Sequence, residues 1–303
     1  MSSTTLWFGA LSPPSIKQRT LSPKIWTCVG ALAIPLWATW PSLAIRTLEI
    51  PAFESLAVMF FFGSFVFASL NRSDGADIEQ SSSKRSWLPA IVYGLALAGG
   101  DTFFILSTHR IPAAQANLIS YLWPVMIVVF GAFIGLFRLR LRQIVGLVLG
   151  FSGAVILIWD GRVSMSIGGI GLALLSGAVW AAYCVFRLCW KQPAGNVLAR
   201  GCAISATLCA LLHVLLEPTI MPSLGALAAT AVAGMIPLAL GNFVWDQGFR
   251  RGDSHLLAVM AYATPLCSAL LLASLGAALL TWNLLTGAVV IVLAGLLSRA
   301  DRP

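Results

Sequence analysis

Charged residues are scarce in this 303-residue sequence. They make up 10% of the chain, whereas about 25% of the residues of a soluble domain are charged. Apolar residues make up 58%. This balance excludes an intrinsically disordered protein, which needs low hydrophobicity and high charge. It also argues against a soluble enzyme, because too few polar side chains remain to cover a surface in water. We therefore expect the lipid bilayer to be the solvent.

Sequence signatures of several other protein classes are missing. The six cysteines form no Cys-x-x-Cys pair and lie in or beside apolar stretches, which is typical of buried free thiols. His213 has no metal-ligating companions in the sequence. No G-x-x-x-x-G-K-[ST] phosphate loop occurs, which argues against direct use of ATP. The sequence thus predicts no catalytic residue, no metal and no cofactor.

Long uncharged stretches predict the membrane spans, since a helix crosses the hydrocarbon core with about 20 residues. The stretches are 25–45, 55–71, 87–108, 111–137, 143–159, 163–186, 201–216, 218–245 and 254–298, and Asp101 is the one charged residue among them. The last one holds two spans, with a break at 276–283. We therefore predict an all-α integral membrane protein with ten transmembrane helices. Residues 1–23 carry no cleavable signal pattern and are expected to form a cytoplasmic tail.

The distribution of basic residues predicts the orientation of these spans. When the loops are assigned alternately to the two faces, one face receives only Arg46, Arg110 and Arg162, and all other Lys and Arg residues fall on the opposite face. Lys and Arg accumulate on the cytoplasmic side, so both termini should be cytoplasmic. The same clustering between spans accounts for the net charge of +8 without a nucleic-acid partner.

The two halves of the sequence resemble each other. Gly100-Asp101 matches Gly241-Asn242, and Tyr121-Leu122-Trp123-Pro124 matches Tyr262-Ala263-Thr264-Pro265, both pairs being 141 positions apart. The same register relates Gly135 to Gly276 and Gly146 to Gly287. We infer two five-helix repeats, residues 24–160 and 161–299.

The number of spans in each repeat fixes how the two repeats are related. Because five is odd, the second repeat enters the membrane from the opposite side and is inverted. Inverted repeats are typical of secondary transporters, with the substrate near the midplane at the repeat interface. Two nearly equivalent halves also permit two nearly equivalent states, open inward and open outward.

These segments resemble a known family. Together with Leu36-Trp37-Ala38-Thr39 and residues 177–184, they are similar to the drug/metabolite transporter superfamily, with two EamA-type repeats, and within it to the YddG-type aromatic amino-acid exporters of bacteria. The resemblance covers nearly all of residues 25–298 and implies aromatic amino acids among the substrates. Relatives often have Asn where this chain has Asp246.

The fourth predicted helix carries a polar face. Asn117, Tyr121 and Pro124 follow one another at helical spacing and share this face. It either lines a cavity or packs against a neighbouring helix, with Asn117 as a hydrogen-bonding group. Pro124 should bend this helix. Pro265 repeats the bend, and Pro237 is expected to bend the eighth span.

Aromatic residues well inside the spans have two interpretations. They can belong to the interfacial aromatic belt, or they can stack on an aromatic substrate and hold an ammonium group. The belt fits rings near span ends, such as Trp87 and Trp282, better than it fits Trp123 and Trp180. Counting the interior rings and polar residues together, we expect the substrate to contact Trp37, Trp40, Asp101, Asn117, Tyr121, Trp123, Trp180, Tyr183, Asn242, Trp245 and Tyr262, and we expect gating at Pro124, Pro237 and Pro265.

Asp101 is the one acidic residue far inside an apolar stretch. A carboxylate at membrane depth costs about 2.5–3.5 kcal/mol on insertion scales and is by default a functional candidate. It can be a proton site, a partner for a substrate ammonium group, or a capped structural group. Asp246, by contrast, is expected to form a surface ion pair with Arg250 at i+4.

The sequence therefore predicts a secondary transporter that exports aromatic and other neutral amino acids and related small metabolites across the inner membrane by alternating access. The expected partners are the substrate and the lipid bilayer, and no oligomer is required. The alternative is a membrane-embedded enzyme acting on a lipid-soluble substrate, for which Asp74, Asp77 and Glu79 would supply a metal–diphosphate site. The polar, Ser-rich character of that loop favours a solvated linker.

Overall fold

The structure is a computed structural model. It describes residues 22–47, 49–73, 87–111, 113–136, 140–158, 166–189, 194–261, 263–276 and 282–297. Within these ranges the chain is helical and contains no strand. The acidic loop of the enzyme alternative, residues 74–79, and the predicted tail at 1–21 lie outside the described residues.

The helices follow the predicted spans, and several spans are divided into shorter helices. The first half contains α1 (Pro23–Ala31), α2 (Ala33–Ala38), α3 (Trp40–Ala44), the 3₁₀ turn η1 (Ile45–Thr47), α4 (Ala52–Ser73), α5 (Trp87–Thr108), α6 (Ala113–Ser120), α7 (Trp123–Phe133) and α8 (Leu141–Ile158). The second half contains α9 (Ile167–Cys189), α10 (Ala194–Leu216), α11 (Leu224–Ala233), η4 (Gly234–Gly241), α12 (Asn242–Arg251), α13 (Ser254–Met260), α14 (Ala263–Ser274) and α15 (Trp282–Leu297).

Six stretches of the described chain are long and apolar enough to cross a membrane by themselves. They are Pro23–Ala44, Ala52–Leu70, Trp87–Thr108, Ile167–Cys189, Asn196–Leu216 and Leu224–Arg251. Four shorter apolar helical stretches lie in the remaining predicted spans: Trp123–Phe133, Ile144–Gly153, Leu256–Ser268 and Leu285–Ala294. The chain is thus a multi-pass, all-helical membrane protein in the part described.

Proline accounts for two of the helix interruptions. The fourth span is not a bent rod: a turn at Tyr121 and Leu122 separates α6 from α7, and Pro124 sits in the first turn of α7, where its missing N–H costs nothing. Pro237 lies inside η4, which is a π-helix that joins α11 to α12. Such π segments accommodate a lost helical hydrogen bond and are frequent at functional sites.

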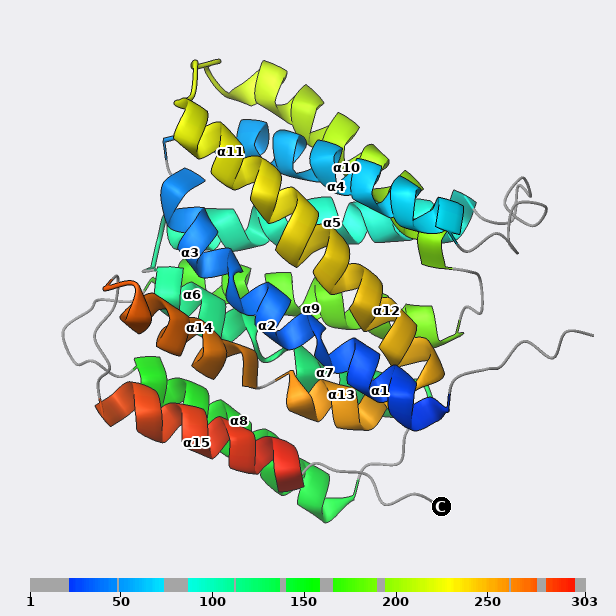
Figure 1. The fold of residues 1–303 in the computed structure, drawn as a ribbon. Coiled ribbons are helices and arrows are strands. Elements are labelled where there is room, and N and C mark those ends of the chain that lie inside the picture. The colour runs from blue at the N-terminus through cyan, green and yellow to red at the C-terminus, as the bar shows by residue number, and fades with distance from the viewer. Residues whose placement is uncertain are drawn as a thin grey trace, which may run out of the picture.

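The helices pack in an order that mixes the two halves of the chain (Figure 1). α4 packs against α10, α10 against α5, and α5 against α9, while α1 packs against α12 and α2 against both η4 and α14. α8 and α15 pair with each other at one side of the bundle. The central helices α2, α5, α7, α9 and η4 therefore come from both halves and surround the middle of the molecule.

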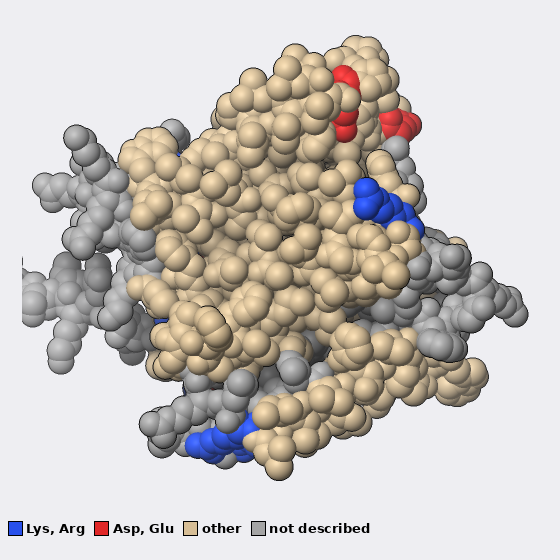
Figure 2. All heavy atoms as spheres, turned by 180° about the vertical axis from the view of Figure 1, so that it is seen from behind, with Lys and Arg blue, Asp and Glu red and all other residues tan. Residues whose placement is uncertain are grey.

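Large apolar side chains are exposed on the outside of the bundle. Phe65, Leu95 and Phe151, for example, are more than half exposed. Figure 2 shows one face of the molecule, on which few charged side chains are visible, and these lie toward its margins. An exposed apolar surface of this kind is what a bilayer requires.

Hydrogen bonds tie the two halves together at the end of the bundle where α3 ends. The Glu49 carboxylate accepts a bond from the Ser223 amide (2.8 Å) at the start of α11, and contacts with Ser223 lower the pKa of this exposed glutamate. The Glu217 carboxylate accepts bonds from the amides of Phe53 and Glu54 at the start of α4. Glu54 and Glu217 thus lie at helix ends, in the first turn of α4 and directly after α10.

Candidate functional site

A cavity of about 180 Å³ lies between the central helices and is lined by residues of α2, α3, α4, α5, α6, α7, α9, α11, η4 and α12. Eight of the residues predicted to contact substrate line this cavity. They are Trp37, Trp40, Asp101, Asn117, Tyr121, Trp123, Trp180 and Asn242. The structure therefore brings together residues spread over more than 200 positions of the sequence.

One wall of the cavity depends on a close approach between α6 and α9. Gly177 allows this approach, because a Cβ atom at that position would lie 2.5 Å from the Ser120 carbonyl oxygen. The approach places the hydroxyl oxygens of Ser120 and Ser176 3.4 Å apart, and both residues line the cavity beside Tyr121. The polar face predicted for the fourth span thus faces an open space.

Asn242 holds the opposite wall in place through two hydrogen bonds. The Trp37 indole N–H donates to Asn242 Oδ1 (3.1 Å), and Asn242 Nδ2 donates to the Tyr93 hydroxyl (3.2 Å). Asn242 is 7% exposed and Tyr93 is fully buried. The amide therefore connects α2, α5 and α12 and fixes the orientation of the Trp37 ring at the cavity wall.

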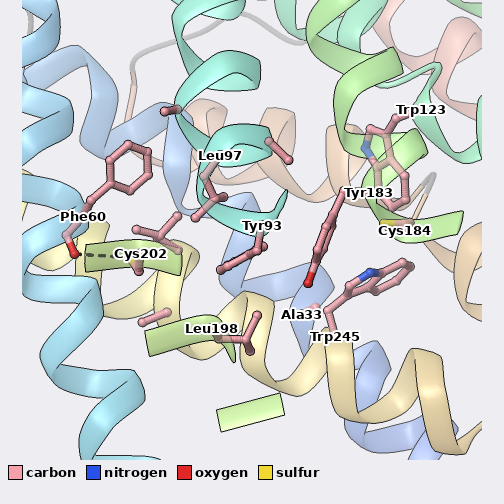
Figure 3. Close-up of a cluster of buried hydrophobic side chains, with 14 of the residues drawn as sticks. Ala33, Phe60, Tyr93, Leu97, Trp123, Tyr183, Cys184, Leu198, Cys202 and Trp245 are labelled. Carbon is pink, nitrogen blue, oxygen red and sulfur yellow. Dashed lines mark hydrogen bonds between the residues drawn. The ribbon is translucent and has the colours of Figure 1, made fainter. Parts of the chain in front are cut away.

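Three tryptophans from three helices form one aromatic cluster, in which Trp37 and Trp123 line the cavity and Trp245 lies behind them. The ring centroid of Trp37 lies 6.0 Å from that of Trp123, and Trp245 lies 5.1 Å from Trp37 and 5.4 Å from Trp123. The two contacts of Trp123 are edge-to-face, the geometry that aromatic pairs prefer. Figure 3 shows the Trp123 and Trp245 rings within the larger buried cluster.

The ionisable group that lines the main cavity is acidic, and no basic group of the described chain accompanies it there. Among the described residues that line it, Asp101 alone is ionisable at neutral pH, and no Lys, Arg or His is present. The other polar groups are amides, hydroxyls and indole N–H groups. An ammonium group would find a charged partner here, whereas a carboxylate would find only neutral donors.

Tyr183 and Trp245 lie outside the main cavity. They line a second cavity of about 10 Å³, together with Arg187 and Asp246, and this second cavity shares Trp180 and Asn242 with the first. In Figure 3 the Tyr183 and Trp245 side chains lie close to each other. The predicted contact residues therefore fall into two neighbouring groups.

Asp246 contacts Arg250 as predicted, but the prediction that this ion pair lies at the surface is wrong, and Arg250 is not the main partner. Asp246 is 5% exposed and pairs with Arg187, which is 2% exposed: Arg187 Nε lies 2.7 Å from Asp246 Oδ1, and Nη2 lies 3.4 Å from Oδ2. Arg250 contributes a longer contact of 3.6 Å to Oδ2. The helical spacing identified the weaker partner, because the stronger one lies 59 positions away on α9.

The remaining predicted residues are the prolines and Tyr262. Pro237 lines the main cavity, and Pro124 and Pro265 are buried. Pro265 lies in the first turn of α14, as Pro124 does in α7. Tyr262 lies outside the described residues.

The sequence prediction missed several residues of the site. Ser120, Ser176 and Phe104 line the main cavity, and Tyr93 and Arg187 line the second. Phe104 follows Asp101 at i+3 and shares its helical face, a signal present in the sequence. Arg187 carried no such signal, because it lies among the basic residues at the end of its span.

No group of three or more His, Cys, Asp or Glu side chains that could hold a metal ion occurs in the described parts of the chain. His213 is buried and contacts Glu217 Oε2 (3.1 Å) and the Thr219 hydroxyl (3.2 Å).

Comparison with known proteins agrees with this architecture. The model of the EamA-like transporter family matches residues 24–159. The aromatic amino acid exporter YddG of Ancylobacter novellus is 32% identical over 256 residues, which cover 82% of this chain and 88% of that protein. The YddG exporter of Salmonella typhimurium is 27% identical over 300 residues, covering 89% and 95% of the two chains.

A solved crystal structure of a protein shares the fold. Its TM-score to this chain is 0.80 at 30% sequence identity, and the superposition covers 91% of this chain and 98% of the other.

Proposed function

Since this chain belongs to the EamA-like transporter family of the drug/metabolite transporter superfamily, we propose that it exports aromatic and other neutral amino acids and related small metabolites across the inner membrane by alternating access. The chain is a transporter, and this membership replaces the membrane-enzyme alternative. Its relatives named as aromatic amino acid exporters motivate the choice of substrate.

The central cavity is the observation that carries this proposal. Its volume of about 180 Å³ exceeds the approximately 150 Å³ at which an apolar protein cavity binds benzene. Trp37, Trp123 and Trp180 can stack on an aromatic side chain. Asp101 can pair with the ammonium group. These features suit an aromatic amino acid, and the hydroxyl and amide groups also suit a smaller neutral one.

We further propose ten transmembrane helices arranged as two inverted repeats, residues 24–160 and 161–299. The helix pairing supports this, because it is preserved when the halves are exchanged: α5–α9 corresponds to α12–α1, α10–α5 to α4–η4, and α7–α9 to α14–α2. Gly135 and Gly276, which are 141 positions apart, are the two glycines with positive φ in the described chain. The stretch matched by the family model, residues 24–159, nearly coincides with the first repeat.

The proposed orientation puts both termini in the cytoplasm. Arg187, Arg200, Arg250 and Arg251 then lie at the cytoplasmic end of the bundle. The main cavity lies toward the external side of Tyr183 and Trp245, since its residues on α9 and η4 precede these rings by three or more positions. The helix interruptions at Pro124, Pro237 and Pro265 would allow half-helices to move and open either side.

Counterflow in proteoliposomes tests the proposal. Vesicles loaded with unlabelled phenylalanine should accumulate labelled phenylalanine faster than empty vesicles, and the rate should saturate. A panel of amino acids on the outside then ranks the substrates, with aromatic ones expected to compete best and threonine less well. The absence of counterflow with every amino acid tested, from protein that remains monodisperse, would refute amino-acid transport.

A further inference from the structure

The Arg187–Asp246 ion pair is almost completely buried, and stability alone does not account for it. The guanidinium contacts both carboxylate oxygens, at 2.7 and 3.4 Å, and the two side chains are 2% and 5% exposed. Replacing a buried ion pair by apolar residues of similar size is often neutral or stabilising. An ion pair buried at this position therefore calls for another explanation.

The second cavity adjoins this pair and contains a polar atom without a partner. Tyr183 Oη is buried and has no hydrogen-bond partner within the described structure. Tyr183 lines the second cavity, as do Trp245, Tyr93 and Phe249. Buried polar groups are nearly always hydrogen-bonded, so an unpartnered one requires an explanation. A ligand that passes through this space would supply the missing partner.

The groups around the second cavity complement a zwitterion. A guanidinium binds a carboxylate through two parallel hydrogen bonds, an aspartate pairs with an ammonium group, and aromatic walls take a ring. We propose that the second cavity is the closed form of a cytoplasmic binding site for zwitterionic aromatic amino acids, in which the substrate carboxylate binds Arg187 and the substrate ammonium binds Asp246 in place of their bond to each other. This proposal rests on the proposed export function.

The site is closed in the present structure and lies next to the main cavity. A volume of about 10 Å³ holds at most one water molecule, so the surrounding helices must separate before a substrate fits. Trp180 and Asn242 line both cavities, and a substrate released past them enters the main cavity directly. The two cavities thus mark successive positions along one path.

The exchange of partners also explains how the site would select its substrate. A zwitterion replaces both halves of the ion pair, so Arg187 and Asp246 each exchange their mutual bond for a bond to the substrate while the helices separate. An amine without a carboxylate offers Arg187 no replacement for its bond to Asp246, and an acid without an ammonium group offers Asp246 no replacement for its bond to Arg187. Breaking a buried ion pair without replacing the bond is strongly unfavourable, and selection against both analogues follows.

Inhibition of transport from the cytoplasmic face tests this site. Inside-out membrane vesicles take up labelled phenylalanine, with unlabelled phenylalanine, 2-phenylethylamine and 3-phenylpropionate as competitors. We expect phenylalanine to inhibit at a concentration at least about 10-fold below either analogue, since a hydrogen bond to a charged group has this effect on affinity. Failure of wild-type vesicles to take up phenylalanine would refute the export function itself.

Two variants assign each charge to a part of the substrate. Arg187→Gln should remove the preference for phenylalanine over 2-phenylethylamine, and Asp246→Asn should remove the preference over 3-phenylpropionate. Arg251→Gln is the matched control, since Arg251 is exposed, stacks over Trp26 and lines neither cavity. It removes a charge from the same end of α12 and should leave both preferences unchanged.

A purely structural ion pair predicts a different result. Breaking it would lower the uptake of phenylalanine without changing the ranking of the three competitors, and that outcome would overturn the proposal. If a single variant does not accumulate in the membrane, the double variant Arg187→Gln with Asp246→Asn replaces it, because it removes both charges of the Arg187–Asp246 pair. It should fail to discriminate against either analogue, and a retained preference for phenylalanine would equally overturn the proposal.

Discussion

Asn242 offers the sharpest test of how the main cavity is held in shape. Asn242→Leu replaces the amide with an apolar side chain of similar length. It removes the acceptor of the Trp37 indole N–H and the donor to the Tyr93 hydroxyl. Leaving a buried polar group without its partner costs about 1–3 kcal/mol. The Trp37 ring would then lose its fixed orientation at the cavity wall.

This cost should appear as weaker substrate binding. A free-energy change of about 1–3 kcal/mol corresponds to a rise of roughly 5- to 150-fold in the half-saturation constant for phenylalanine. Counterflow in proteoliposomes measures it, and elution as a single species in detergent checks folding. The effect should be larger on the half-saturation constant than on the maximal rate, because Asn242 orients Trp37 in the binding cavity.

A double-mutant cycle separates this effect from general damage. Trp37→Phe keeps an aromatic ring but removes the indole N–H, so the bond to Asn242 is already absent in that background. Asn242→Leu should therefore weaken binding less when Trp37 is already Phe. Independent sites add within about 0.3–0.5 kcal/mol. Additivity within that margin would refute the argument that Asn242 acts through Trp37.

Three further predictions concern charge, aromatic contact and orientation. Asp101→Asn keeps the shape of the side chain and should lower transport and change its pH dependence; an unaltered pH profile would leave Asp101 a structural residue. Trp123→Leu or Tyr121→Leu should raise the half-saturation constant for phenylalanine roughly 2- to 12-fold, from about 0.5–1.5 kcal/mol per ring pair, and affect threonine less; equal losses would assign these rings to the scaffold. Cysteine at exposed Arg46, in a cysteine-free background, should be labelled in intact cells, and labelling only after permeabilisation would reverse the orientation.

Much of the fold could be predicted because membrane spans depend on local composition. Uncharged stretches located the helices, and the register of 141 positions pointed to residues that later proved to line one cavity. The interruptions were harder to predict. Pro124 indicated a bend, but whether the chain bends, breaks or forms a π-helix depends on what neighbouring helices offer the freed backbone groups. Pro124 follows a break, and Pro237 lies in a π-helix.

For the site, too, the sequence predicted relations between neighbouring residues of one helix but not contacts between distant helices. Trp180 and Tyr183 are three positions apart and were both predicted to contact the substrate, and their ring centroids are 5.3 Å apart. Helical spacing could not reveal that Trp180 lines both cavities while Tyr183 lines only the second. Which α9 residues line each cavity depends on Asn242 and Trp245, which come from another part of the chain.

Arg187 is a residue of the site that helical spacing could not identify. In the sequence it is one of several basic residues at the end of a span, and the charge asymmetry that predicts orientation treats all of them alike. The fold separates them: Arg200 stacks over Trp87 and Arg251 over Trp26, whereas Arg187 turns inward to Asp246. A basic residue that pairs with an acid in the interior no longer contributes to the charge asymmetry that orients the protein. It belongs instead with the groups that a zwitterionic substrate must meet between the cytoplasm and the central cavity.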